Sequence, residues 1–277
     1  MVRRRVCTGG GRCQWFYRTP DVRLGPGIGT YRGFHSTAGV AQERLVVPSG
    51  RVSLLIGFGG EMRVRGAAGR HTSLVSGLHT RSRVLGHGGD VQGVELTLAP
   101  WAAHRILGPD SSLAELADTL TDPADVLGPR ARHLAERLAA APTWPERFAV
   151  LDETLLRWTA EETASPSSPV LEAWHVLERS GGTLPIREVA ATTGWSLRHL
   201  EARFREQIGL TPKRLARILR LNRAIRLLTA GHRPAETAAR CGLYDQAHLS
   251  REFTSMTGLP PTRFLADQAA ASSWIAG

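Results

Sequence analysis

A repeated block near the C-terminus constrains this sequence more than any other feature. The segment from His199 to Arg214 returns at His248 and ends at Arg263. Within it, His, Leu, Phe, Gly, Leu, Pro and Arg recur at one offset of 49 residues. Such self-similarity indicates two copies of one supersecondary unit. The C-terminal region is therefore expected to fold as a tandem of similar units.

Each copy has the pattern of a helix, a tight turn and a second helix. The first copy predicts a short helix at residues 186–192, a left-handed turn at Gly194 and a second helix capped by Ser196. The second copy predicts the same with Gly242 and with Asp245 as cap, and its turn is one residue longer. Helix-turn-helix geometry is the favoured interpretation, and two ordinary helical hairpins that never touch DNA are the alternative.

The segment between the two copies predicts one long helix at residues 212–229. Its inward positions follow a spacing of three and four residues: Leu215, Ile218, Asn222, Ile225 and Leu228. Arginine recurs at every third position from 214 to 226, so these side chains wind around the helix. We expect this helix to end before Gly231 and Pro234 and to act as a rigid strut between the copies.

The run from Gly242 to Phe253, followed by Gly258 and Pro261, resembles the signature of the AraC/XylS family of transcription regulators. The resemblance covers residues 170–268. It implies two helix-turn-helix units whose second helices enter successive major grooves of double-stranded promoter or operator DNA. It also implies RNA polymerase as a partner, a small-molecule effector or dimerisation acting through the front of the chain, and no cofactor.

Carried over residue by residue, the resemblance assigns base reading to Arg198, Glu201, Ala202, Gln246, Ala247, Ser250 and Arg251. It assigns phosphate contacts to Ser196, Arg203, Arg205 and Asp245. Arginine can bridge guanine O6 and N7, glutamine can bridge adenine N6 and N7, glutamate can accept from cytosine N4, and alanine offers a methyl contact. We expect the aromatic side chains of the region to lie in the core: Trp195, Phe204, Phe253 and Phe264.

The front of the chain has a different pattern. Short apolar runs separated by glycine and proline predict antiparallel strands at residues 44–47, 52–58, 74–75 and 94–98. After Pro100, helical spacing predicts helices that include residues 113–120 and 144–158. Residues 45–56 resemble a hairpin of the cupin-like barrels found in the same family. The predicted fold class is α+β, with a cupin-like β-barrel and packed helices followed by an all-α domain.

Composition changes predict where the domains begin and end. Residues 1–20, which are rich in arginine and glycine, predict a flexible basic tail. Residues 21–162 predict a sensory or regulatory domain, and the polar, proline-containing stretch 163–169 predicts a linker. The DNA-binding domain then spans 170–268, with a tail at 269–277.

Net charge supports a polyanionic partner. The chain carries +10, and between residues 170 and 265 there are 15 basic against 8 acidic residues, which places +7 in the repeat region. The three cysteines, Cys7, Cys13 and Cys241, show no disulfide spacing. Since neither a signal peptide nor a membrane span is evident, we expect a cytoplasmic protein with no membrane partner.

Enzymatic function is the main alternative class, either on the barrel or as DNA repair by a reactive cysteine. Cys7 and Cys13 lie among glycine and arginine residues, but no base or orienting acid accompanies them. His71, His79 and His87 lack the spacing of a metal site, so we predict no metal ligands and no enzyme. An architectural DNA binder without an effector is the third class.

Overall fold

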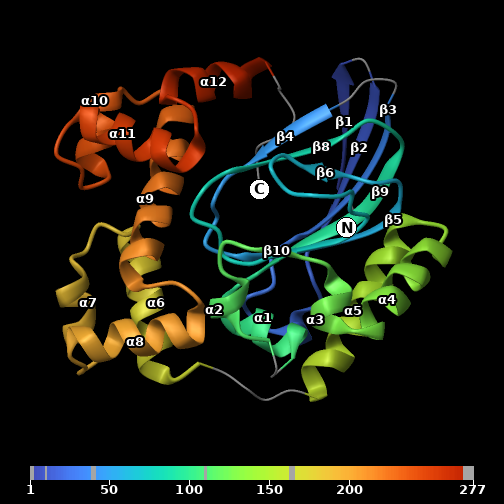
Figure 1. Cartoon of the computed structure of the whole chain (residues 1–277), viewed down its shortest axis with the longest axis horizontal. Helices are drawn as coiled ribbons and strands as arrows, with labels where there is room; N and C mark the ends of the chain where they lie inside the picture. The colour runs from blue at the N-terminus through green and yellow to red at the C-terminus, as the bar shows by residue number, and fades with distance from the viewer. Residues whose placement is uncertain (1–2, 10, 39–41, 109–110, 162–165, 271–277) are drawn as a thin grey trace. The chain divides into compact units, whose positions relative to one another are not determined.

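The computed structural model describes residues 3–9, 11–38, 42–108, 111–161 and 166–270. The chain divides into two compact units. The first comprises residues 1–45, 51–77 and 83–165, and the second comprises 46–50, 78–82 and 166–277. The first unit combines sheets with helices and the second is built from helices, so the predicted α+β class is confirmed (Figure 1).

Strands dominate the first unit. They are β1 (Arg3–Gly9), β2 (Gly11–Arg18), β3 (Tyr31–Ala38), β4 (Gln42–Val46), β5 (Val52–Gly59), β6 (Arg63–Val64), β7 (Leu74–Ser76), β8 (Arg83–His87), β9 (Val91–Leu98) and β10 (Leu120–Thr121). One sheet has the order β1-β2-β3-β9-β5-β7-β10, and a smaller sheet has the order β4-β8-β6. The neighbouring strands of the large sheet pair antiparallel, as do β6 and β8 of the small one.

Short helices and two longer ones complete this unit. They are the 3-10 helix η1 (Val22–Leu24), α1 (Pro100–Leu107), α2 (Leu113–Leu116), α3 (Pro123–Leu127), α4 (Pro129–Ala140) and α5 (Trp144–Glu161). None of the described helices is long and apolar enough to cross a membrane. Within the described residues, no three His, Cys, Asp or Glu side chains gather as a metal site.

One face of the large sheet packs against α5. The face carries fully buried apolar side chains, among them Leu54, Ile56 and Leu96. The ring of Tyr31 stacks on Phe148 of α5, with centroids 6.0 Å apart. Since successive side chains of a strand point to opposite faces, the alternate residues of these strands face away from α5.

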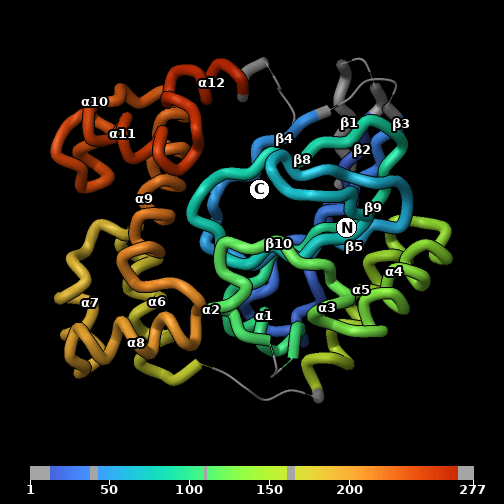
Figure 2. The backbone as a smooth tube through the Cα atoms, viewed as in Figure 1, coloured from blue at the N-terminus to red at the C-terminus, as the bar shows by residue number. Residues whose placement is uncertain are grey.

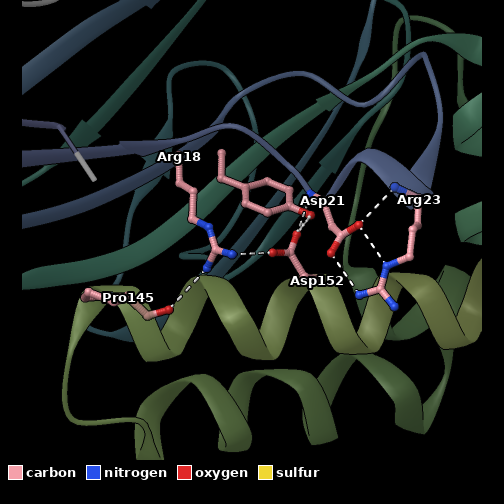
Figure 3. A network of polar contacts seen from close by, with 6 residues as sticks. Arg18, Asp21, Arg23, Pro145 and Asp152 are labelled. Carbon is pink, nitrogen blue, oxygen red and sulfur yellow. Dashed lines mark hydrogen bonds and ion pairs between the residues drawn. The ribbon is translucent and has the colours of Figure 1, made fainter. Parts of the chain in front are cut away.

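A polar network ties the end of β2 to α5 (Figure 3). Asp152 is 6% exposed. Its carboxylate accepts hydrogen bonds from the Tyr31 hydroxyl at 2.9 Å and from the Asp21 amide at 3.0 Å. It also pairs with Arg18 at 2.8 Å. Burial, followed by the Asp152 charge, raises the pKa of Tyr31, so this hydroxyl remains a donor. The network fixes the start of the 3-10 segment on the helix.

The flexible tail predicted for residues 1–20 is wrong for most of its length. β1 and β2 form an antiparallel pair, and β2 continues into β3 with Trp15 opposite Phe34. Trp15 and Phe16 are both buried although they point to opposite faces. A strand buried on both faces lacks the alternation of apolar and polar residues by which strands are recognised.

Two further predictions in the first unit are corrected. β4 and β5 belong to different sheets, so residues 45–56 do not form a hairpin. The helix predicted at 113–120 stops at Leu116, Asp118 adopts φ +58°, and Leu120–Thr121 pairs with β7 instead. A helix of only two turns is marginal by itself, so strand pairing can displace it.

The second unit contains seven helices within the described residues. They are α6 (Ser168–Ser180), α7 (Ile186–Thr192), α8 (Leu197–Ile208), α9 (Pro212–Thr229), α10 (Pro234–Arg240), α11 (Gln246–Thr257) and α12 (Pro261–Ala270). The prediction of a helix at 212–229 is confirmed. The predicted linker is shorter in the structure, because α6 already begins at Ser168; residues 162–165 and 271–277 lie outside the described residues.

We predict that Asp152→Ala lowers the free energy of unfolding by roughly 3 kcal/mol, because it leaves the buried Tyr31 hydroxyl without its acceptor and removes the ion-pair partner of Arg18. Urea denaturation followed by circular dichroism measures this loss. Glu153→Ala is the matched control, since its ion pair with Arg137 lies on the surface at a 62% exposed carboxylate. Glu153→Ala should lower the free energy of unfolding by less than about 1 kcal/mol. Equal losses would contradict the assigned role of Asp152.

Candidate nucleic-acid interface

The first helix-turn-helix consists of α7 and α8. Gly194 takes φ +70° in the turn, where a side chain would be strained. Ser196 has extended backbone angles, and its hydroxyl accepts a hydrogen bond from the His199 amide at 3.3 Å, which begins α8. Val189 and Leu200 are fully buried between the helices. The predicted turn and cap are confirmed.

The second helix-turn-helix consists of α10 and α11. Gly242 takes φ +65°, and the Asp245 carboxylate accepts from the His248 amide at 2.6 Å. A core cluster holds the two helices against α9: Ala224, Ala238, Cys241, Leu243 and Leu249, with Leu227 beside them. Burial raises the pKa of the Cys241 thiol, which is therefore a packed core residue and no nucleophile.

α9 connects the two helix-turn-helix units, and the tube in Figure 2 shows α7 and α8 near one end of it and α10 and α11 near the other. Arg217 of α9 makes a bidentate ion pair with Glu252 of α11, with its Nε at 2.9 Å and one Nη at 3.1 Å from the carboxylate oxygens. A planar pair of this kind fixes orientation as well as distance. α11 is therefore held on α9 by both apolar and charged contacts.

The first helix-turn-helix is held on α9 through the turn that follows α6. A Cβ added at Gly182 would lie 2.2 Å from the Ala216 carbonyl oxygen, so only glycine lets this turn lie against α9. Arg223 donates to the Ser180 carbonyl at 3.4 Å. The same turn reaches the second copy, because a Cβ at Gly242 would lie 3.5 Å from Thr183. The two copies are thus tied to each other as well as to α9.

Most of the predicted base-reading residues are exposed on the second helix of their unit. Arg198 and Ala202 on α8, and Gln246, Ala247 and Arg251 on α11, are exposed, while Glu201 and Ser250 are half-buried. Within the described part of the chain, the Arg198 and Arg251 side chains make no ion pair or hydrogen bond. These guanidiniums are therefore available to an external acceptor.

The four residues predicted to contact phosphate differ in whether their side chains already have a partner within the protein. The side-chain oxygens of Ser196 and Asp245 already cap their helices, so these residues place exposed helix N-termini at the surface. Arg203 pairs with Glu206 at 2.9 Å. Arg205 is exposed and has no side-chain partner in the described residues. Of the two arginines, Arg205 is therefore the more available for a phosphate contact.

Two exposed side chains next to the predicted base-reading residues were not predicted from the sequence. Tyr244 is 93% exposed in the turn before α11, and Leu197 is 42% exposed at the first position of α8. The 49-residue offset pairs Leu197 with Gln246, so the repeat itself contained the signal for Leu197. By the same offset Tyr244 corresponds to Trp195, but Trp195 is half-buried whereas Tyr244 is exposed.

The prediction of core aromatics holds for Phe204, Phe253 and Phe264, which are at most 1% exposed. Trp195 is different, because it is only partly buried and its ring contacts the edge of His199 at a centroid distance of 4.5 Å. It lies in the turn before α8, where the chain is too close to the surface to bury an indole. Cys13, considered above as a nucleophile, is 1% exposed.

Comparisons with known proteins point to one family. The model of a helix-turn-helix domain family matches residues 189–267. The HTH-type transcriptional regulator YbfI of Bacillus subtilis, itself uncharacterised, is 33% identical over 110 residues, which span 38% of this chain and 40% of YbfI. The chain therefore covers less than half the length of this relative.

Solved structures resemble the same region. A regulator with an AraC-type DNA-binding domain from Chromobacterium violaceum is 27% identical, with a TM-score of 0.34 over 36% of this chain and 92% of that one. The DNA-binding domain of the global transcriptional factor AdpA, solved with a target DNA, is 29% identical, with a TM-score of 0.35 over 38% of this chain and 96% of that one. By its family match over residues 189–267 and its doubled helix-turn-helix, the C-terminal region of the chain is a helix-turn-helix domain, and it is similar in sequence to the AraC-type DNA-binding domains named above.

Proposed function

We propose that this chain is a transcription regulator that binds double-stranded promoter DNA with α8 and α11 in successive major grooves. Arg198, Glu201 and Ala202 contact bases from α8, and Gln246, Ala247, Ser250 and Arg251 contact bases from α11. Arg205, Arg203 and the helix N-termini at Ser196 and Asp245 contact the phosphates. The first unit modulates this binding through a small-molecule effector or through dimerisation.

The observation that carries the proposal is the contrast between paired and unpaired arginines. Arg217, Arg240 and Arg263 are engaged with carboxylates of the same unit. Arg198 and Arg251, each on the second helix of a helix-turn-helix, have no such partner in the described residues. An exposed cation gains most from the phosphates and guanines of DNA when no internal carboxylate already neutralises it.

The length of α9 determines what kind of DNA fits. Its 18 residues span about 27 Å at 1.5 Å each, whereas major grooves on one face of straight DNA recur at about 34 Å. A protein whose reading helices are closer than the groove repeat can engage both grooves only if the DNA bends. Bending is therefore part of the proposed binding mode.

Replacing both unpaired arginines should abolish specific binding. We expect Arg198→Ala with Arg251→Ala to weaken binding to the promoter beside the chain's own gene by about 2 kcal/mol or more, since each arginine-guanine contact contributes roughly 1–3 kcal/mol. Fluorescence anisotropy across a salt series measures the affinity and its salt dependence.

Arg132→Ala with Arg130→Ala is the matched control for this experiment, because it removes the same charge from α4 of the first unit. The control should retain wild-type affinity at every salt concentration. If the wild-type chain bound random DNA as tightly as the promoter, the sequence-specific function would be refuted and an architectural binder would be favoured.

A bend should accompany specific binding. We expect fluorescence energy transfer between dyes at the two ends of a promoter fragment to rise when the full chain binds, because the ends approach each other as the DNA bends. Arg251→Ala, which weakens one of the two contacts, should lower the transfer at saturating protein. Unchanged transfer in the wild-type complex would mean that the two helices do not engage neighbouring grooves together.

A further inference from the structure

A buried charge cluster lies on the face of the large sheet that points away from α5. Arg32 of β3 pairs across the strands with Glu95 of β9, and its guanidinium contacts the Glu95 carboxylate. Ser53 of β5 donates to the same carboxylate at 3.0 Å. Arg44 of β4, in the small sheet, approaches Glu95 with both Nη atoms at 3.4 Å. Residues from two sheets therefore meet around one carboxylate.

The two arginines of the cluster carry one positive charge more than the Glu95 carboxylate neutralises. Arg32 and Arg44 share a single oxygen of Glu95, and within the described residues neither has a second carboxylate in contact. The other titratable side chains that act on Arg32 are those of Tyr17 and Cys13, and phenols and thiols are largely protonated at pH 7. Arginine keeps its proton in proteins. Leaving a charge unpaired in a buried place costs several kcal/mol.

The pKa values of the two arginines shift in the direction that this excess predicts. Burial lowers the pKa of Arg32 to about 10. Burial, and then the neighbouring Arg32 charge, lower the pKa of Arg44 well below its ordinary value. Both shifts arise first from burial, which disfavours the charged form, and for Arg44 the neighbouring cation adds to it.

Arg44 is the less engaged of the two. Its contacts with Glu95 at 3.4 Å are longer than the 2.7–2.9 Å or so of a strong charged hydrogen bond. The side chains of Arg32 and Arg44 remain 21% and 14% exposed, so a solute can reach the pair. Arg44, together with a further N–H of Arg32, which stays paired with Glu95, can therefore donate to a second anion.

Aromatic side chains lie next to the cluster. The Arg32 guanidinium carbon is 5.0 Å from the centre of the Trp15 ring, and Trp15 contacts Phe34 with ring centres 5.8 Å apart. Both aromatic residues share the sheet face with Arg32 and are buried. Four residues further along β3, the buried hydroxyl of Ser36 has no hydrogen-bond partner among the described residues. The surroundings suit a molecule with an anionic end and an apolar body.

We propose that the first unit binds a small monoanionic organic carboxylate whose head group bridges Arg32 and Arg44 and whose apolar body lies toward Trp15 and Phe34. One negative charge matches the excess, whereas a dianionic phosphate would exceed it. The inference rests on the proposed function in one respect, since the carboxylate would be the effector through which the first unit modulates DNA binding.

Thermal unfolding of the full chain tests this site directly. The probes are sodium octanoate, sodium benzoate and sodium 3-phenylpropionate at constant ionic strength, each with its uncharged amide as control. We expect at least one carboxylate to raise the Tm saturably by about 2 °C or more, as a ligand specific to the folded state does, and its amide to leave the Tm unchanged. Failure of all three carboxylates to shift the Tm would overturn the proposal.

Variants separate the cluster from other cations. Arg44→Gln should abolish the carboxylate shift, while Arg65→Gln, which removes an exposed arginine paired with Glu43, should retain it. Without any carboxylate, Arg44→Gln should leave the Tm unchanged or raise it, because the variant removes the excess buried charge. A lower Tm for this variant, or a carboxylate shift that survives in it, would show that Arg44 is a structural partner of Glu95 only.

Promoter binding without carboxylate keeps this inference distinct from the proposed function. Arg44→Gln should bind promoter DNA with wild-type affinity under these conditions, since the cluster lies outside the second unit. A chain that binds DNA but shows no carboxylate shift contradicts the anion site alone. A chain that shows the shift but does not bind promoter DNA contradicts the proposed function alone.

Discussion

The burial of α9 is the constraint on which the second unit depends. The helix packs against α6 and α8 of one copy and against α10, α11 and α12 of the other. Its apolar side chains that face both copies are buried, among them Leu215, Ile218 and Leu228. Each such side chain contributes about 1.5–3 kcal/mol, and a close-packed interior leaves no freedom to slide. The separation of α8 and α11 follows from this packing.

The charged side chains serve two purposes, since some stabilise the fold and others are exposed to a binding partner. The arginines along α9 illustrate the division: Arg217 orients α11 through Glu252, Arg223 donates to the turn after α6, and Arg226 remains exposed. A net charge of +10 alone does not distinguish these roles. The first unit differs, because Arg32 and Arg44 place two positive charges on side chains that are only 21% and 14% exposed.

The sequence predicted the second unit far better than the first, for physical reasons. The turn glycines, the Ser196 and Asp245 caps and the helix at Pro212–Thr229 depend on local chemistry that short segments specify. The β2 strand and the end of α2 depend on partners distant in sequence. Tertiary contacts therefore decided the elements that local patterns missed. Arg198 and Arg251 are exposed, as the base-reading role implied by the family resemblance requires, but the exposure of Tyr244 did not follow from its counterpart Trp195, which is half-buried.

Methylation-interference footprinting of the full chain on its promoter tests the central claim most directly, because it maps each major groove that the protein enters. If α9 holds α8 and α11 for simultaneous engagement, guanine methylation should interfere in two windows on one face of the DNA, about 10 base pairs apart. Arg251→Ala should remove one window and leave the other. A single window in the wild-type complex, or two windows on opposite faces, would contradict the account.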